Sequence, residues 1–590
     1  NISEFVQSAR TLYNPISEPL RFYINTYQKL LTYNFMRKVF ILILLIGICV
    51  DLLAQTPTCY RVYLHDKADS PYSITQPEEF LSPRAIAKRE RFNIPITEQD
   101  FPINPNYLQA LHVSENVQIL STSKWMNCAV VYSLHTNDFN TIAALPFVDS
   151  ILPVANYNLS ILGKKGGYIK ELPAKKEKSL LTNDYDYGYS IEQIQIHNGQ
   201  YLHQAGFQGD SMLIAILDAG WDGLPESQYF EDFVQSGRLL GTKDYIPGTT
   251  SVYNGSSHGT SVTSIIGLAL EGELIGSAPR ANFYFIRTEN PLSEELIEED
   301  FWAAGAEFAD SIGADVINSS LGYTTFPDFP QAEFTQAHND GVTSIASRAA
   351  TIAGEKGIVV VISAGNEGNS EWIKLGRPAD AINVLAVGAC NKDSLIAEFS
   401  SRGYSADGRV KPDVCAVGWD TWCVLYYDNY GEWIGQNNGT SLSGPVIAGM
   451  AACLWQALPH KTSSEIMQII RENGHLYNTP DSLMGYGIPD FFQAYLENRD
   501  SEDSTSIANY NRSNFSLFPN PCYQNFTLES FEDPITQVDL FDIRGRMISN
   551  TKVEGNQQQL TFDISSLPPG IYIVKAKSER KYGILKVIKK

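Results

Sequence analysis

The stretch Leu213-Ile-Ala-Ile-Leu-Asp218-Ala-Gly220 decides the fold of this chain. Five apolar residues in a row, with no polar alternation, are typical of a strand buried on both faces of a parallel sheet. The run ends in Asp218 and a glycine-containing turn, and open α/β sheets bind their ligands at the carboxyl ends of their strands. By itself, such an aspartate is more often a helix cap or a turn former.

Apolar strands alternate with amphipathic helices over residues 186–498. This alternation predicts an α/β domain, a parallel sheet with helices on both faces. Long helices are expected at residues 294–312 and 441–457. The strands expected from apolar runs are residues 213–217, 283–286, 316–317, 358–362 and 384–387.

The regions on either side of this domain differ in composition. Residues 55–162 carry short alternating segments with helical patches between them, which predicts a small α+β domain. The basic, glycine-containing residues 163–185 and the polar residues 499–513 have little to bury and are predicted to be linkers. Residues 514–590 are rich in β-forming residues and predict a small β-sandwich.

The first methionine is Met36, so residues 1–35 are expected to be an untranslated or non-native upstream segment. Residues 36–54 have the basic start, apolar run and small final residue of a signal peptide. The apolar run over residues 39–48 is too short for the ~20 residues of a membrane anchor. Ile48 before Cys49 disfavours a lipoprotein, so we expect an exported protein.

Charge and cysteine content exclude some classes of protein. The chain has 66 acidic and 44 basic residues and a net charge of -22, which argues against a nucleic-acid partner bound through phosphates. Its 8 cysteines form neither a CxxC pair nor a Cys/His cluster, which argues against a structural zinc. Cys415 and Cys423 lie close in sequence, and two alternatives stay open for them: a disulfide or buried free thiols.

Three further patterns carry candidate functional residues. His258 begins a helix of small residues. A lone histidine at such a place is usually a polar cap, but the Gly and Thr that follow it allow the backbone to approach a functional site closely. Asn366 follows a buried strand between glycines, where a simple turn residue is the alternative. Ser441 lies in the first turn of an apolar helix, where the helix dipole stabilises an oxyanion.

The order Asp218, His258, Asn366, Ser441, with the residues around each, strongly resembles the subtilisin-like serine peptidases, or subtilases. The likeness extends over most of residues 186–498, and the order Asp, His, Ser separates this group from other Ser-His-Asp hydrolases. An α/β-hydrolase needs a Gly-x-Ser-x-Gly elbow, and Ser443 stands where its second glycine belongs. Other matching motifs are Gly276-Ser-Ala-Pro279, Asn318-Ser-Ser-Leu-Gly322 and Gly485-Tyr-Gly487.

The resemblance implies a role for each residue. Ser441 is the expected nucleophile, His258 the general base and Asp218 the residue that orients the imidazole. Asn366 and the Ser441 N–H are expected to form an oxyanion hole during peptide hydrolysis through an acyl-enzyme.

The resemblance also implies a substrate-binding strand that pairs with an extended peptide. Its residues are Ser320, Leu321 and Gly322, and Ala364 and Gly365 complete the pocket for the residue before the cut. Because these residues are small and uncharged, an apolar side chain is expected there. Residues 323–340 are an insertion relative to compact family members, which leaves the pocket shape open.

The flanking regions carry resemblances of their own. Residues 56–160, with Phe80-Leu-Ser-Pro-Arg84, resemble the N-terminal region of subtilases from a large group of Gram-negative bacteria. This implies a ferredoxin-like propeptide that acts as an intramolecular inhibitor and is cut within residues 163–186; a permanent accessory domain is the alternative. The C-terminal residues, with Leu517-Phe-Pro-Asn-Pro521 and Leu567-Pro-Pro-Gly-Ile-Tyr572, resemble the sorting domain of type IX secretion. An immunoglobulin-like appendage that binds substrate is the alternative.

These features together predict a secreted serine endopeptidase made as a zymogen, with protein or peptide substrates and the secretion machinery as partners. It is expected to cross the periplasm of a Gram-negative bacterium and to be secreted or attached to the cell surface. The alternative is a catalytically silent adhesion or binding protein on the same scaffold. No cofactor is required by this chemistry. Structural calcium stays open, because subtilases frequently bind it but no ligand set is readable, and Asp300 and Asp428 are interpreted as ordinary solvated charges.

Overall fold

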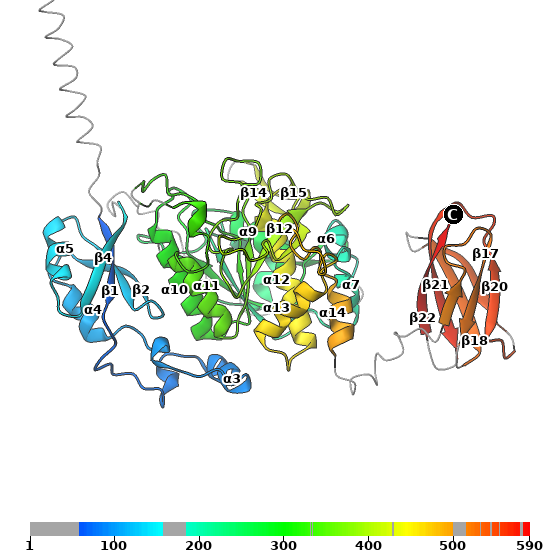
Figure 1. Ribbon diagram of the computed structural model, residues 1–590, viewed down its shortest axis with the longest axis horizontal. Helices are drawn as coiled ribbons and strands as arrows, with labels where there is room; N and C mark the ends of the chain where they lie inside the picture. The colour runs from blue at the N-terminus through cyan, green and yellow to red at the C-terminus, as the bar shows by residue number, and fades with distance from the viewer. Residues whose placement is uncertain are drawn as a thin grey trace, which may run out of the picture.

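The computed structural model describes residues 58–156 and 185–590, except residues 250, 331, 333, 428–429, 500–514, 531–532, 543–545, 554 and 579–581. The expected upstream segment 1–35, the signal peptide 36–54 and nearly all of the two expected linkers lie outside the described residues. The described chain forms an N-terminal, a middle and a C-terminal unit (Figure 1).

The middle unit contains a seven-stranded sheet in which every pair of neighbouring strands is parallel. This confirms the predicted parallel sheet. Its strands, in spatial order, are β13 (Val414–Val417), β12 (Leu385–Cys390), β11 (Val359–Ser363), β10 (Val316–Ser319), β5 (Leu213–Asp218), β9 (Asn282–Arg287) and β6 (Leu239–Asp244).

The two outermost strands, β6 and β13, were not among the predicted ones. Strand β6 is mostly polar and largely exposed, as befits an edge strand, and β13 has 4 residues. The polar sequence of β6 carries no signal for a buried strand, whereas β13 is a short apolar run, Val414–Val417, that the sequence analysis missed.

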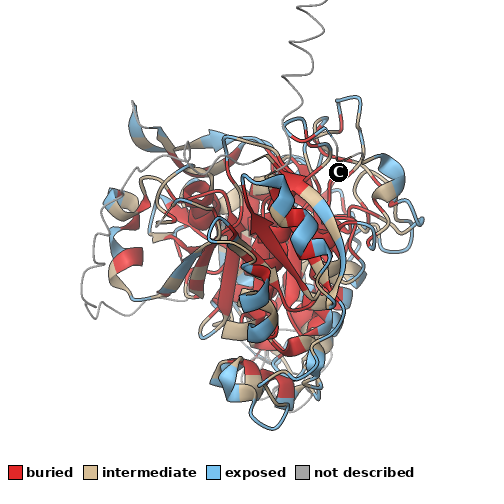
Figure 2. Cartoon of the chain, turned by 90° about the vertical axis from the view of Figure 1, so that its left-hand side faces the viewer, coloured by how far each residue is buried: buried red, intermediate tan, exposed pale blue. Residues whose placement is uncertain are grey.

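Helices cover both faces of this sheet, as predicted. Ile214 and Ile216 of β5 pack with helix α12 (Thr440–Ala457), whereas Ala215 and Leu217 pack with helix α10 (Ile297–Ile312). Figure 2 shows the buried residues gathered in the strands. The other helices of the unit are α6 (Ile191–Gln195), α7 (Gly199–Gln204), α8 (Glu231–Gln235), α9 (His258–Gly267), α11 (Ile345–Glu355), α13 (Ser463–Glu472) and α14 (Phe491–Asn498), with 3₁₀ turns η3 (Leu224–Glu226), η4 (Gln228–Phe230) and η5 (Gln336–His338).

Two antiparallel hairpins complete the middle unit: β7 (Ala269–Leu270) with β8 (Leu274–Ile275), and β14 (Thr421–Tyr427) with β15 (Gly431–Asn437). The second hairpin packs on helix α9, where Ser261 Oγ donates a hydrogen bond to the Val424 carbonyl. Cys415 and Cys423 are both buried and free, so the buried-thiol alternative holds for them.

The N-terminal unit is an antiparallel sheet in the order β2 (Gln118–Ser123), β3 (Cys128–Tyr132), β1 (Cys59–Leu64), β4 (Val148–Ala155). Helices α4 (Pro105–Leu111) and α5 (Thr136–Ala143) cover one face, which confirms the ferredoxin-like α+β prediction. The other face packs against α10 of the middle unit.

A long connection between β1 and α4 carries helix α3 (Pro83–Arg91) and the turns η1 (Pro77–Glu79) and η2 (Glu98–Asp100). Ser82 caps α3 by accepting a hydrogen bond from the Ala85 N–H, and Pro83 occupies the first helical position, which together start the helix.

The C-terminal unit is a β-sandwich, as predicted. One antiparallel sheet holds β16 (Phe515–Phe518), β17 (Asn525–Ser530) and β20 (Gln559–Asp563). The other holds β19 (Met547–Lys552), β18 (Ile535–Asp542), β21 (Gly570–Ser578) and β22 (Tyr582–Lys589). The two sheets share a core of their own. Across the described parts of all three units, we find no helix with the length and apolarity of a membrane span.

Candidate active site

The four predicted catalytic residues lie where sheet strands end and helices begin. Asp218 is the last residue of β5, and Asn366 follows β11 by three residues. His258 is the first residue of α9, and Ser441 is the second residue of α12. Parallel strands end at a common edge, so the topology directs these residues to one side of the sheet.

Asp218 and His258 form a hydrogen-bonded pair. The imidazole Nδ1 lies 2.8 Å from Oδ1 and 3.0 Å from Oδ2 of the carboxylate. The Asp218 side chain is fully buried, whereas 32% of the His258 side chain is exposed. The Ala219 N–H also donates to Oδ1, at 2.8 Å. With Nδ1 held by the carboxylate, Nε2 is the ring nitrogen left to exchange protons with a substrate.

The pair also tunes the imidazole as a base. Burial lowers the pKa of His258, but the charge and hydrogen bond of Asp218 more than offset this, and the Glu289 carboxylate adds to the increase. The pKa of His258 therefore lies above its ordinary value of 6.5. A raised pKa makes the imidazole a stronger base for accepting a proton from a hydroxyl group.

Gly439 leaves open the space that Ser441 and Asn366 share. A Cβ at this position would lie 3.0 Å from the Ser441 Oγ and 3.8 Å from the Asn366 Nδ2. Its φ of 152° also disfavours any residue with a side chain. The Ser441 hydroxyl and the Asn366 amide group thus border the same small volume.

Thr440 fixes the orientation of the Asn366 amide. Oδ1 of Asn366 accepts hydrogen bonds from the Thr440 N–H at 2.9 Å and from Thr440 Oγ1 at 3.1 Å. The Gly365 N–H in turn donates to Thr440 Oγ1 at 3.1 Å. With Oδ1 occupied, Nδ2 is the donor left for a ligand. The sequence analysis missed this role of Thr440. Nothing in the residues around Thr440 indicates that it contacts Asn366, which lies 74 residues away in the sequence.

The structure joins these residues in two pairs, His258 with Asp218 and Ser441 with the Asn366 segment. In the described residues, no hydrogen bond connects His258 Nε2 with Ser441 Oγ. The Ser441 carbonyl accepts a hydrogen bond from Ser320 Oγ at 2.9 Å, which places the predicted substrate-binding segment beside Ser441.

The other predicted substrate-binding residues lie close to one another. The Gly376 N–H donates to the Ala364 carbonyl at 3.1 Å, and the next residue, Arg377, exchanges two backbone hydrogen bonds with Tyr323. Gly376 and Arg377 therefore link the Ala364–Gly365 wall to the Ser320–Gly322 wall.

The predicted insertion, residues 323–340, folds back on this link. The Arg377 guanidinium lies 3.9 Å from the ring centroid of Phe334 and 5.8 Å from that of Phe326. Tyr323 and Phe326 are buried in the core. Its described residues thus pack against the segment that links the two predicted substrate-binding segments.

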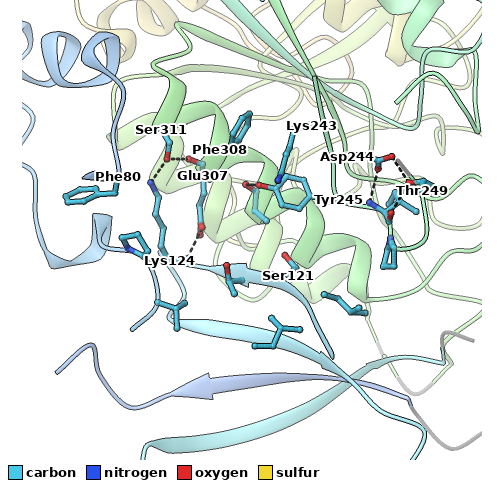
Figure 3. Close-up of a pocket in the computed structure, with 18 of the residues that line it drawn as sticks. Phe80, Ser121, Lys124, Lys243, Asp244, Tyr245, Thr249, Glu307, Phe308 and Ser311 are labelled. Atoms are coloured by element: carbon cyan, nitrogen blue, oxygen red, sulfur yellow. Dashed lines mark hydrogen bonds between the residues drawn. The ribbon is translucent and has the colours of Figure 1, made fainter. Parts of the chain in front are cut away.

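The N-terminal unit contacts helix α10 through buried carboxylates. Glu307 accepts hydrogen bonds from Ser123 Oγ at 2.5 Å and from the backbone N–H groups of Lys124 and Trp125 at 2.8 and 3.0 Å. Beside this contact lies a cavity of about 610 Å³ between the N-terminal sheet and α10, lined also by Lys243 and Asp244 (Figure 3). The cavity thus lies in the contact between the two units and is not lined by the catalytic candidates.

The interpretation of Asp300 as a solvated charge is wrong. Its carboxylate is buried in the same contact and accepts from Arg61 Nε at 2.5 Å and Nη2 at 2.7 Å. Helix α10 buries its polar face against the N-terminal unit, which removes Asp300 from water. Asp428 lies outside the described residues.

No described set of three His, Cys, Asp or Glu side chains converges as metal ligands. Structural calcium, which also binds backbone carbonyl and amide oxygens, stays an untested expectation, and we derive no step through a metal.

Comparison with known families assigns three segments. Residues 209–487 match the subtilase family, residues 59–166 match the peptidase S8 propeptide domain of Bacteroidota, and residues 516–590 match a secretion system C-terminal sorting domain. The three matches correspond to the middle, N-terminal and C-terminal units.

Characterised relatives match the middle part of the chain. Subtilisin E of Bacillus subtilis is 31% identical over 283 residues, which are 47% of this chain and 63% of that protein. Subtilisin of Bacillus pumilus is 30% identical over 283 residues, 88% of its length. Among solved structures, a Pseudoalteromonas arctica protease has 21% identity and a TM-score of 0.42, covering 53% of this chain and 99% of that one. From the identity with the Bacillus pumilus subtilisin and its coverage, we conclude that the chain belongs to the subtilase family.

Proposed function

We propose that this protein is a serine endopeptidase that hydrolyses peptide bonds through an acyl-enzyme. The observation that carries the proposal is the Asp218–His258 hydrogen bond at the sheet edge where Ser441 and Asn366 share one open volume. Family membership supports the same reaction.

In the proposed mechanism, Ser441 Oγ attacks the carbonyl carbon of the substrate while His258 Nε2 takes its proton. The new C–O bond places negative charge on the carbonyl oxygen, which accepts hydrogen bonds from Asn366 Nδ2 and the Ser441 N–H. When the C–N bond breaks, His258 returns the proton to the leaving amine. Water then hydrolyses the acyl-enzyme by the same path. No step needs a cofactor, because His258 carries each proton, and Asn366 Nδ2 with the Ser441 N–H stabilises the negative charge.

The substrate is proposed to lie along Ser320, Leu321 and Gly322 as an added strand. Ala364 and Gly365 would bound the pocket for the residue before the cut. The small, uncharged character of these residues supports an apolar side chain at that position.

The protein is further proposed to be a zymogen whose N-terminal unit acts as an intramolecular inhibitor. The match to a propeptide family and the buried polar contacts of Asp300 and Glu307 support this role. Processing is proposed within residues 163–186. The match of residues 516–590 supports export and recognition by a secretion machinery, with passage through the periplasm of a Gram-negative cell.

A fluorophosphonate probe tests the proposed activity, because it reacts with an activated serine. The processed protein is expected to be labelled and to cleave casein, and Ser441→Ala is expected to lose both properties. Ser443→Ala is the matched control: its hydroxyl is buried and donates a hydrogen bond to the carbonyl of Thr440, three residues earlier in the same helix, so labelling should persist. If the processed protein is neither labelled nor active, the binding-protein alternative is favoured.

A further inference from the structure

Beside the catalytic histidine lies a carboxylate that the proposed mechanism does not use, Glu289. The residues before and after it, Thr288 and Asn290, are hydrogen-bonded to the end of β5 and to helix α10. The Thr288 N–H donates to the Asp218 carbonyl at 3.1 Å, and the Asn290 N–H donates to Glu298 Oε1 at 3.1 Å. The Glu289 side chain therefore lies between the end of β5 and the first turn of α10, next to the Asp218–His258 pair.

The carboxylates of Glu289, Glu294 and Glu298 lie near enough to repel one another, although they do not converge on one point. Glu289 and Glu294 are half-buried, and neither carboxylate has a hydrogen bond or ion pair within the described structure. Glu298 behind them is completely buried, and its Oε2 has no donor among the described residues. His258 supplies the one positive charge that acts on Glu289 there. A buried carboxylate oxygen without a donor is costly, so this arrangement calls for a proton or a cation.

The protonation of the cluster reflects this cost. Burial, followed by the charges of Glu294 and Asp218, raises the pKa of Glu289 to about 8. Burial and the charges of Glu289 and Glu294 likewise raise the pKa of Glu298 well above its ordinary value. The cluster thus keeps protons at neutral pH and would exchange them for an approaching cation.

We propose that Glu289, with Glu294 beside it and Glu298 behind it, is a subsite for a lysine or arginine side chain of the polypeptide substrate. This inference rests on the proposed function, since it assigns a substrate preference to that same cleft.

The position of the subsite in the cleft follows from Tyr323. The Tyr323 hydroxyl lies 3.5 Å from the Glu298 carbonyl, to which it donates, and Tyr323 directly follows the Ser320–Gly322 segment. That segment is proposed to pair with the substrate before the cut. The basic side chain should therefore lie on the N-terminal side of the cleaved bond.

A flexible organic cation fits this cluster better than a metal ion. The Glu298 Oε2 atom is shielded from solvent, and no three carboxylates of the described chain converge as metal ligands. A lysine or arginine side chain needs to reach only Glu289 and Glu294, which are partly exposed.

The charge of the chain's own connecting segment agrees with this preference. The last described residue of the N-terminal unit, Asn156, donates its N–H to Glu295 Oε1 at 2.7 Å, and Glu295 adjoins Glu294. Residues 157–184, which begin at this contact, contain six lysines and three acidic residues. Proteolytic maturation would thus present basic side chains to the acidic cluster.

The test uses the processed enzyme and matched fluorogenic peptides that carry Lys, Arg, Gln or Glu at each of the second to fourth positions before the cut. At one of these positions, wild-type kcat/KM is expected to be about tenfold higher for Lys or Arg than for Gln. Glu289→Gln should abolish the preference, and Glu289→Lys should shift it towards Glu. Glu371→Gln, which removes an exposed carboxylate elsewhere, is the control and should keep the preference.

The pH dependence adds a readout that a merely structural role would not change. The groups that act on Glu289 are Asp218, His258, Glu294 and Glu298. The ratio of kcat/KM for Lys over Gln peptides should rise with a midpoint near pH 8 as Glu289 ionises, and it should be flat in Glu289→Gln.

Two results would overturn the subsite while leaving the peptidase intact: cleavage without any preference for a basic residue, or a preference that survives in Glu289→Gln. Failure of the processed wild type to cleave any peptide would instead overturn the proposed function, and the subsite with it.

Discussion

At the residue scale, Asn366 and Thr440 form the best-defined part of the site. Two hydrogen bonds from Thr440 hold the Asn366 amide with Nδ2 towards the volume that Ser441 Oγ also borders. A donor that is already oriented stabilises developing charge without reorganisation. The amide is therefore expected to act on the rate of reaction more than on substrate binding.

We expect Asn366→Ala to lower kcat by about 10²–10³ with little change in KM, since one oxyanion donor is lost; the magnitude is that measured on a subtilisin. Steady-state kinetics on a peptide substrate with the processed enzyme measures both constants. A loss of less than tenfold would mean that Asn366 is not a main donor to the oxyanion.

The Asp218–His258 pair is expected to set the pH dependence of the proposed reaction. His258 must be neutral to take a proton, and the Asp218 carboxylate raises its pKa. Activity should therefore fall with decreasing pH through a midpoint above 6.5. In Asp218→Asn, burial still lowers the pKa of the ring, so the midpoint should move to lower pH, while kcat drops by about 10⁴.

Profiles of kcat/KM against pH for both proteins measure this shift. An unchanged midpoint in Asp218→Asn would contradict the assignment of the titrating group to His258.

At the element scale, helix α3 attaches the N-terminal unit to the end of α10. Arg89 Nη2 donates to the two carboxylate oxygens of Asp310 at 2.8 and 2.9 Å, and it also contacts Asp100 at 3.3 Å. Lys356 of the middle unit reaches Asp100 at 2.9 Å. All of these charged groups are buried, so each one depends on its partners.

We expect Arg89→Ala, introduced into the inactive Ser441→Ala zymogen, to reduce the free energy of unfolding by about 3 kcal/mol. This value is at the lower end of the range for removing one partner of a buried ion pair. The lower end applies because Arg89 Nε and Nη1 are buried without a partner in the described structure, and because Lys356 still faces Asp100. Denaturant unfolding of the zymogen measures the change.

His65→Ala is the control, since the His65–Asp149 pair is exposed and should contribute little. The processed peptidase from the Arg89→Ala chain should be as stable as wild type, because residue 89 belongs to the N-terminal unit. A zymogen as stable as wild type would show that α3 does not hold the two units together.

At the scale of the whole molecule, the C-terminal sandwich has a core separate from that of the middle unit. Its buried residues, such as Phe526, Leu540 and Val574, pack with one another. No residue of the sandwich belongs to the two clusters that fill the described peptidase sheet.

A chain that ends after Asn498 should therefore keep the kcat/KM of the processed full-length enzyme and its unfolding temperature. In cells, the same truncation should prevent release of the protein to the outside, because the sorting domain is absent. Peptide kinetics, calorimetry and immunoblots of cell fractions measure these outcomes. If activity were lost on truncation, the sandwich would have to support the peptidase directly.

Local patterns in the sequence identified most of the sheet and all four catalytic candidates. Strands β5, β9, β11 and β12 are continuous apolar runs, and Asp218, His258, Asn366 and Ser441 stand in short motifs beside strands or helices. By contrast, Glu289, Glu298 and Asp300 look like ordinary surface charges in the sequence. Their local residues give no sign that the packing of α10 removes the last two from water.

The amino-acid sequence alone determined the α/β architecture, the order of the units and the residues on which the proposed chemistry depends, because these follow from hydrophobic runs and short motifs. Only the tertiary structure decided that Thr440 orients Asn366, that Arg61 neutralises Asp300 and that Glu289 lies beside His258. Each of these contacts joins residues more than 30 positions apart, and their energies depend on burial and distance, which exist only once the chain has folded.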